Sequence, residues 1–344
     1  MKRLAGVLEL LAPVAVVAAV GFVGSFTSRS NEIQFRDTLV AVTIVVALYV
    51  FVGNSGVLSF GHVSFVALGA FASGIMTLQA DVKPGVLPDL FPLLRDHTLG
   101  NAEGLALAAG LGGLYAFLVG LPLMRLSGLA AGIATFAVLG ITHNVLTYWT
   151  KIGPGAGTLS LVPETTNLLQ ATLGALAVIA IAYAYQRSRL GRMLRASRED
   201  PAAAQAAGIN VHRQRLWAFT LSGALSAFAG ALYVHLLGTI TAQQVYLDLT
   251  FLSLAMLVIG GVSSLWGAVL GALLINGFSS FLANAEDGVG FPFHLDLPTG
   301  SRLVVIGAFM ALVIILRPSG ITGGRELRLP VPRRRAREPA IVEK

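Results

Sequence analysis

Long apolar stretches separated by short polar segments are the main pattern of this chain. Several are shorter than the roughly 20 residues that carry a helix across a bilayer, but their repetition is typical of a membrane protein. Inside a bilayer the backbone must satisfy its own hydrogen bonds, which a helix does. We therefore expect an all-α, polytopic transmembrane helical bundle. About ten spans are predicted, near residues 4–26, 38–53, 63–80, 104–122, 128–147, 168–186, 216–237, 249–264, 266–283 and 301–316.

The composition excludes an ordinary soluble protein. Of the 344 residues, 55% are apolar and 12% are charged, whereas soluble domains carry about 25% charged residues. A formal charge of +7 would suggest nucleic acid in a soluble chain. Here the cations stand at span ends and on the tail, so we expect membrane lipid as a partner and no nucleic acid. The chain has no cysteine, which excludes disulfides and thiolate ligands.

The basic residues predict an orientation. With the N-terminus inside, eighteen of the 24 Lys and Arg residues fall on the inner side. The positive-inside rule then places both termini in the cytoplasm, and an even number of spans agrees. The opening MKRLAGVLELLAPVAVVAAVGFVGSF resembles a signal peptide, but its apolar run is long and has no clean cleavage site. We therefore interpret it as a retained first span.

One polar segment between the spans, residues 187–215, carries clear helix signals. Asp200 suits an N-cap, Pro201 the first helical position and Gly208 a left-handed C-terminal stop, which predicts a helix of about two turns. Such a short helix is marginal alone in water, so we expect a partner protein to dock on it at the cytoplasmic face. The preceding arginines recur every third residue and form a slanted basic band on a helix. They are Arg189, Arg192, Arg195 and Arg198.

Glycine and hydroxyl residues gather in the apolar stretch 53–70. Small residues let helices approach closely, and glycine clusters let a spanning helix break where it lines a cavity. The stretch therefore predicts either a discontinuous helix near residues 53–62 beside a translocation path or simply tight helix packing. The candidate path residues are Gly53, Asn54, Gly56, Ser59, Gly61 and His62. A second glycine-rich stretch, residues 260–271, predicts a tight turn between two spans on the cytoplasmic side.

Side chains that could relay protons or perform chemistry are scarce in the predicted spans. Glu9, His62, His143 and His235 are isolated along the sequence, and no spacing of His, Asp or Glu fits a metal site. No serine has an evident base and acid partner, and the phosphate-binding pattern GxxxxGK[ST] is absent. We therefore expect no enzyme activity, no metal and no other cofactor. Any work driven by ATP must come through another subunit.

Three segments, in this order, resemble LivM-type permeases, the inner-membrane subunits of bacterial ABC importers for branched-chain amino acids. They are GNSGVLSFGHVSFVALGAF at 53–71, SRLGRMLRASREDPAAAQAAGINVHRQRLWAFTLSGALSAFAGALY at 188–233 and VIGGVSSLWGAVLGALLI at 258–275. The resemblance covers about residues 38–318. It implies a multi-pass permease in the bacterial inner membrane. The implied partners are a second, LivH-like permease, two cytoplasmic ATPase subunits and an extracytoplasmic substrate-binding protein.

In this family the segment after the arginine-rich stretch is the coupling helix, which sits in a cleft of the ATPase. The resemblance carries this contact to Arg198, Glu199, Asp200, Ala203, Ala204, Gly208, Ile209 and Asn210. Pro201 and Gln205 stand where relatives often carry an acidic or apolar residue and a Glu, so the contact chemistry differs in detail. In an external loop, residues 151–157 keep the glycines of the TGGxxG pattern of relatives but not their spacing, which leaves the substrate open.

These observations predict two parts. Residues 1–320 form a transmembrane permease domain with the cytoplasmic coupling loop 187–215, and residues 321–344 form a basic, disordered cytoplasmic tail. The expected function is import of branched-chain amino acids, driven by ATP hydrolysis on partner subunits. One alternative is an ABC permease for urea, short amides or another small metabolite. The alternatives of another class are a stand-alone secondary transporter or channel, and a membrane enzyme.

Overall fold

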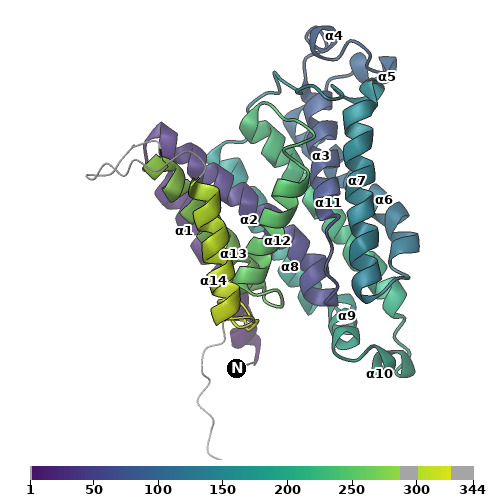
Figure 1. The fold of residues 1–344 in the computed structure, drawn as a ribbon, viewed down its shortest axis with the longest axis vertical. Coiled ribbons are helices and arrows are strands. Elements are labelled where there is room, and N and C mark those ends of the chain that lie inside the picture. Colours follow the sequence, from purple (N-terminus) through teal and green to yellow (C-terminus); the bar gives the residue numbers. More distant parts are fainter. Residues whose placement is uncertain (1, 287–300, 327–344) are drawn as a thin grey trace, which may run out of the picture.

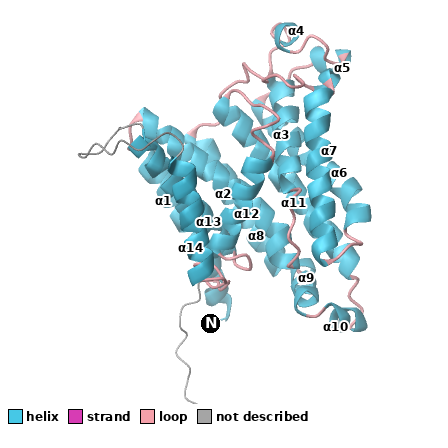
Figure 2. Cartoon of the chain, in the orientation of Figure 1, coloured by secondary structure: helices cyan, strands magenta, loops and turns pink. Residues whose placement is uncertain are grey.

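The computed structural model describes residues 2–286 and 301–326. Their regular structure is helical, apart from one isolated bridge between Leu159 and Ile240 (Figures 1 and 2). The prediction of an all-α fold is therefore confirmed, and each of the ten predicted apolar segments forms a helix. These helices are α1 (Lys2–Gly24), α2 (Arg29–Ser55), α3 (His62–Thr77), α6 (Asn101–Leu123), α7 (Gly128–Tyr148), α8 (Leu168–Arg187), α11 (Val211–Leu237), α12 (Leu247–Gly260), α13 (Leu265–Glu286) and α14 (Ser301–Leu316).

Not all of these helices have the length of a complete membrane span. Within the described residues, six are long and apolar enough to cross a membrane, namely α2, α6, α7, α8, α11 and α13. Helices α3, α12 and α14 have 16, 14 and 16 residues, which is short against the usual ~20 residues. The structure therefore shows a polytopic helical chain, while the number of ten spans stays a prediction.

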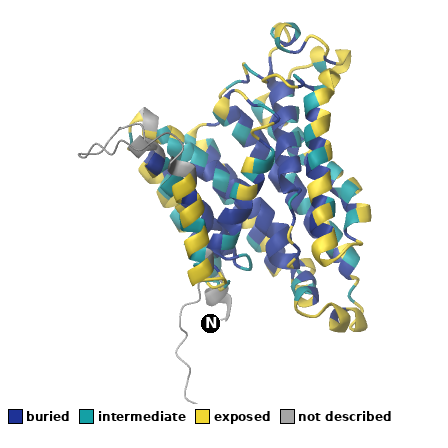
Figure 3. Ribbon diagram, in the orientation of Figure 1, coloured by how far each residue is buried: buried dark blue, intermediate teal, exposed yellow. Residues whose placement is uncertain are grey.

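Helix α11 is the centre of the bundle and packs on α2, α3 and α6. Figure 3 shows α2, α3 and α11 as largely buried, whereas α6, α7 and α14 turn exposed faces outward. A Cβ at Gly69 of α3 would overlap the carbonyl oxygen of Ala227 of α11, and a Cβ at Gly230 would overlap the carbonyl oxygen of Val66. These two helices therefore pack backbone to backbone, as small residues allow.

The two ends of the bundle carry different connections (Figure 1). The start of α1, the end of α14 and the helices α9 (Arg189–Glu199) and α10 (Pro201–Ala206) lie at one end, which we call the arginine-rich end. The short helices α4 (Lys83–Val86) and α5 (Pro92–Arg95) lie at the opposite end. The start of α1 and the end of α14 therefore lie at the same end of the bundle. That this end is cytoplasmic stays a prediction.

Residues 317–326, which we call the C-terminal segment, fold back on the turn between α12 and α13. The contacts are hydrogen bonds from Ile321 N to Ile259 O (2.7 Å), from Thr322 Oγ1 to Gly260 O (2.7 Å) and from Ser263 Oγ to Gly324 O (3.2 Å). Of the tail predicted at 321–344, residues 327–344 lie outside the described residues. The first six residues of that tail are part of this packed segment.

Candidate functional site

The predicted short helix is present as α10, and both of its ends are formed as the sequence predicts. The Asp200 Oδ1 atom accepts hydrogen bonds from the backbone N–H groups of Ala202 (3.0 Å) and Ala203 (2.9 Å), which makes it the N-cap. Pro201 occupies the first helical position, and Gly208 follows the helix with φ of +81°. The start and stop signals are therefore confirmed.

The residues that the resemblance assigns to the ATPase contact differ in exposure. Glu199, Asp200, Ala203, Gly208 and Asn210 are exposed, Arg198 and Ile209 are half-buried, and Ala204 is buried. Asn210 also has a structural role, because its Oδ1 atom accepts the N–H of Arg213 (3.0 Å) and caps α11. Helix α10 thus presents a small-residue surface at the arginine-rich end. Its contact with an ATPase stays a prediction.

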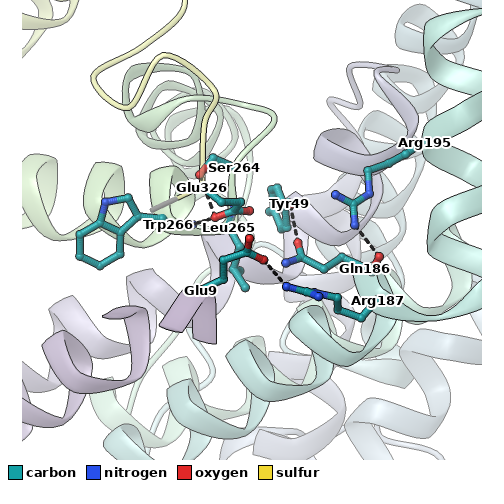
Figure 4. A network of polar contacts seen from close by, with 9 residues as sticks. All are labelled: Glu9, Tyr49, Gln186, Arg187, Arg195, Ser264, Leu265, Trp266 and Glu326. Carbon is teal, nitrogen blue, oxygen red and sulfur yellow. Dashed lines mark hydrogen bonds and ion pairs between the residues drawn. The ribbon is translucent and has the colours of Figure 1, made fainter. Parts of the chain in front are cut away.

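The arginine band of α9 is divided between solvent and protein. Arg189 and Arg192 are exposed. Arg195 turns back and donates a hydrogen bond to the carbonyl oxygen of Gln186, whose side chain accepts the hydroxyl of Tyr49 (2.8 Å) (Figure 4). The band is therefore not a uniform basic surface, because half of it binds the bundle.

Arg198 joins the two segments that the sequence singled out separately. Its Nη1 atom donates to the carbonyl oxygen of Gly53 in the last turn of α2 (2.8 Å). Its Nε and Nη2 atoms donate to Glu199 (3.1 and 2.8 Å). The aliphatic stem crosses Gly56, where a Cβ would lie 2.6 Å from the Arg198 Cγ atom. The last carbonyls of a helix have no partner within the helix and carry partial negative charge, so a guanidinium is well suited to this place.

The predicted helix interruption near 53–62 lies between α2 and α3. Helix α2 stops before Gly56, which has φ of +70°, and α3 begins at His62. The connecting residues are non-helical and rest on α7, where the Thr135 Oγ1 atom accepts the N–H of Phe60 (3.2 Å). A Cβ at Gly61 would overlap the carbonyl oxygen of Thr135. Glycine is therefore required at both ends of the connection, for its backbone angle at Gly56 and for space at Gly61.

Five of the six predicted path residues are buried, and Gly56 is exposed. The His62 ring packs among aromatic rings, and its Nδ1 atom lies 2.7 Å from the Ser59 Oγ atom. The neighbouring rings are Phe51, Phe65 and Phe219, at centroid distances of 5.5, 5.6 and 5.3 Å. Among the described residues, the Asn54 Oδ1 and His62 Nε2 atoms have no hydrogen-bond partner although they are buried. Buried polar atoms are usually paired, so these two are expected to meet water or a ligand.

Glu326 is a structural residue that the sequence prediction missed. Its carboxylate accepts the N–H groups of Leu265 (2.8 Å) and Trp266 (3.2 Å) and the hydroxyl of Ser264 (3.1 Å), and so it caps the start of α13 (Figure 4). An anion at a helix N-terminus is stabilising. No local signal could have indicated this contact, because a glutamate in a basic, proline-containing tail is usually solvated.

A cavity of about 400 Å³ lies between α2, α11, α12 and α13, and it contains a second missed residue. Asp37 lines it and accepts a hydrogen bond from the Nδ2 atom of Asn276 (3.0 Å). The candidate span of α2 is Asn31–Ser55, so this carboxylate lies inside it. The apolar pattern begins at residue 38, so the sequence prediction did not include Asp37.

A family model described as "Branched-chain amino acid transport system / permease component" matches residues 35–315. The chain belongs to this family. The match covers both glycine-rich stretches, the arginine-rich segment and nearly all of the helices that surround them.

Individual relatives agree with this family. The high-affinity branched-chain amino acid permease protein LivM of Escherichia coli K12 is 24% identical over 319 residues, which cover 83% of this chain and 68% of the relative. The probable LivH of Methanocaldococcus jannaschii is 33% identical over 143 residues, or 40% of this chain and 42% of the relative. LsrC, an autoinducer 2 import permease of Enterobacter sp. strain 638, is 29% identical over 232 residues, or 63% of this chain and 67% of the relative. No solved structure matches.

The resemblance to LivM-type permeases is therefore confirmed, and the chain is a multi-pass inner-membrane protein. Its relatives are transport permease components and not enzymes. A permease component of an ABC importer implies partner permease and ATPase subunits and a binding protein.

Proposed function

We propose that this chain is one permease subunit of a heterodimeric ABC importer that moves branched-chain amino acids into the cytoplasm. A second, LivH-like permease completes the pore, two cytoplasmic ATPase subunits supply the energy, and an extracytoplasmic binding protein delivers the substrate. The observation that carries this proposal is α10, a short helix with both ends capped that is held out at the arginine-rich end. A Cβ at Gly208 would meet no atom within 4 Å, so this end of α10 is open to a partner.

The packing of the arginine-rich segment explains how an ATPase could act on the bundle. Helix α9 contacts α2, α8 and α11, and α10 contacts α9 and α11. Closure of the ATPase pair on ATP would displace α9 and α10 together, and these contacts would pass the displacement to the central helices. The spans would then shift between inward-open and outward-open arrangements, a population shift driven by the energy of ATP binding.

The proposed translocation path passes the connection between α2 and α3. Non-helical backbone at membrane depth is tolerated where it is buried in protein or lines a cavity. In such a path Asn54 Oδ1 and His62 Nε2, two of the ten buried unpaired side-chain atoms among the described residues, would meet water or substrate. The loops at the opposite end, including α4 and α5, would receive the binding protein.

The proposed substrate class follows from the names of the LivM and LivH relatives. The LsrC relative supports a second candidate, a permease for another small metabolite, because it matches 63% of this chain. Urea and short amides belong to the same second candidate. In the proposed importer the binding protein selects between these two candidates.

The deciding experiment is vanadate-sensitive uptake of labelled leucine into proteoliposomes that contain the complete importer with its binding protein. Uptake that needs both ATP and the binding protein supports the importer and its substrate class. ATP-stimulated turnover without leucine uptake, but with uptake of autoinducer 2 or urea, would support the second candidate. Gradient-driven uptake by this chain alone would contradict the proposal.

A further inference from the structure

Arg198 differs from Arg195 in how far away along the sequence its hydrogen-bond acceptor lies. Arg195, one turn earlier on the same face of α9, binds the carbonyl oxygen of Gln186, nine residues away in the adjoining helix end. Arg198 binds the carbonyl oxygen of Gly53, which is 145 residues away in the sequence. The contact of Arg195 therefore shapes the arginine-rich segment itself, whereas that of Arg198 ties this segment to α2.

The contact involves the end of α2 and not its surface. Gly53 lies in the last turn of α2, and the chain leaves the helix at Gly56, which has φ of +70°. The Arg198 stem lies directly over Gly56, since a Cβ there would come within 2.6 Å of its Cγ atom. Displacing Arg198 thus acts on the point where α2 stops and the connection to α3 begins.

The outer side of Arg198 faces the surface of the arginine-rich end. Its side chain is 27% exposed, and that of its ion-pair partner Glu199 is 72% exposed. A single guanidinium therefore bridges an exposed carboxylate beside α10 and a carbonyl inside the bundle. The resemblance to relatives assigns Arg198 to the ATPase contact, but the geometry directs its Nη1 atom to α2.

We propose that Arg198 is a positioning residue that couples α9 to the C-terminal end of α2, so that the arginine-rich segment and the α2–α3 connection move together. This inference rests on the proposed importer function, because the motion is driven by the ATPase. It goes further in naming one side chain that transmits the motion and the helix end that receives it.

The test compares three variants in the reconstituted importer. R198M keeps the aliphatic stem but removes both the charge and the hydrogen bonds, and R198K keeps the charge. The control R192M changes an exposed arginine of the same helix whose side chain forms no hydrogen bond or ion pair with the described residues of α2. The measurements are the amount of ATPase that co-purifies, the ATP hydrolysis stimulated by loaded binding protein, and the ratio of substrate imported to ATP hydrolysed.

For R198M we expect ATPase recovery within twofold of the unmodified importer and a ratio of substrate to ATP at least tenfold lower. R198K should recover part of this ratio, and R192M should keep it. An unchanged ratio in R198M would overturn the assignment, and so would loss of ATPase recovery, since Arg198 would then act in the ATPase contact. If the unmodified importer shows no ATP-driven uptake, the proposed function fails instead, and the role of Arg198 fails with it.

A distance measurement on the folded, monodisperse complex tests the coupling independently of uptake. The chain has no cysteine, so two spin labels can be attached at cysteines that replace exposed Leu58 and Ala196. With Arg198 present, the distance between the labels should stay the same with and without ATP. In R198M it should change between these states by several ångströms. Equal behaviour in both backgrounds would overturn the coupling role.

Discussion

Two helix ends meet at the arginine-rich end of the bundle, and a charged side chain from elsewhere in the chain holds each of them. Arg198 binds the C-terminal end of α2, and Glu326 caps the N-terminal end of α13. Each sign matches the partial charge of the helix end that it meets. A cavity of about 670 Å³ lies between them. Its lining consists of Arg195, Arg198, Ser263, Gly324, Arg325 and Glu326.

The difference lies in what each charged residue is attached to. Glu326 belongs to the C-terminal segment, which backbone hydrogen bonds fix to the turn between α12 and α13. This cap therefore anchors α13 to its own neighbours. Arg198 belongs to α9, next to the exposed helix α10, and reaches across to α2. Both contacts pair a charged side chain with the opposite partial charge of a helix end. At α13 the contact fixes the helix to its neighbours, whereas at α2, in our proposal, it connects two segments that move together.

Among the substitutions that test this comparison, we expect the largest loss of substrate uptake at Gly56. In G56D the new Cβ would press on the stem of Arg198, and the carboxylate would compete with the Gly53 carbonyl for the guanidinium. A φ of +70° is uncommon for residues other than glycine, and aspartate tolerates it better than most, so we expect the contact with Arg198 to dominate the effect. We expect substrate uptake to fall more than tenfold while the ATPase still co-purifies.

G128D is the matched control for G56D. Gly128 has a similar φ of +58°, but a Cβ there would meet nothing within 4 Å. The control therefore reproduces the backbone strain without disturbing Arg198, and it should retain most of the uptake. Equal loss of uptake in both variants would assign the effect to backbone strain alone. The contact of Arg198 with the end of α2 would then not be needed for transport.

The sequence predicted what depends on neighbouring residues and missed what depends on the fold. The helix α10 follows from Asp200, Pro201 and Gly208, whose capping interactions all lie within a few residues, and the structure confirms these signals. The apolar runs likewise located ten helices of the described residues, although the run in α2 begins just after Asp37.

The contacts of Arg198 and Glu326 were beyond reach of such signals. Arg198 is separated from Gly53 by 145 residues and Glu326 from Leu265 by 61, and neither pair forms part of a local motif. Both side chains are half-buried against the bundle, whereas a basic band and a charged tail ordinarily remain in water. The two glycine-rich stretches and Arg198 were recognised, but Glu326 and the contact of Arg198 with α2 were not.

We expect an intermediate effect, on binding of the ATPase, at Gly208, which follows the end of α10 that we propose contacts the ATPase. In G208V a β-branched residue would have to adopt φ of +81°, which costs about 1–2 kcal/mol. If this strain distorts the end of α10, the ATPase should bind roughly tenfold more weakly, since 1.4 kcal/mol is a factor of ten. Binding of purified ATPase to the reconstituted permease pair measures this change. Unchanged affinity together with normal uptake would exclude this end of α10 from the contact, while the comparison of the two helix ends would stand.

We expect the smallest effect at Glu326, the residue that anchors the start of α13. E326A removes the cap of α13 and should destabilise the protein by about 1 kcal/mol, which lowers the melting temperature by a few degrees. E326Q keeps an acceptor for the N–H groups but loses the charge, so its melting temperature should lie between those of E326A and the unmodified chain. Thermal unfolding in detergent measures both variants. The ratio of substrate imported to ATP hydrolysed should remain normal in each, in contrast to R198M. A large fall of this ratio in E326A at unchanged melting temperature would show that the start of α13 also transmits motion, and the distinction between an anchor and a connection would then be wrong.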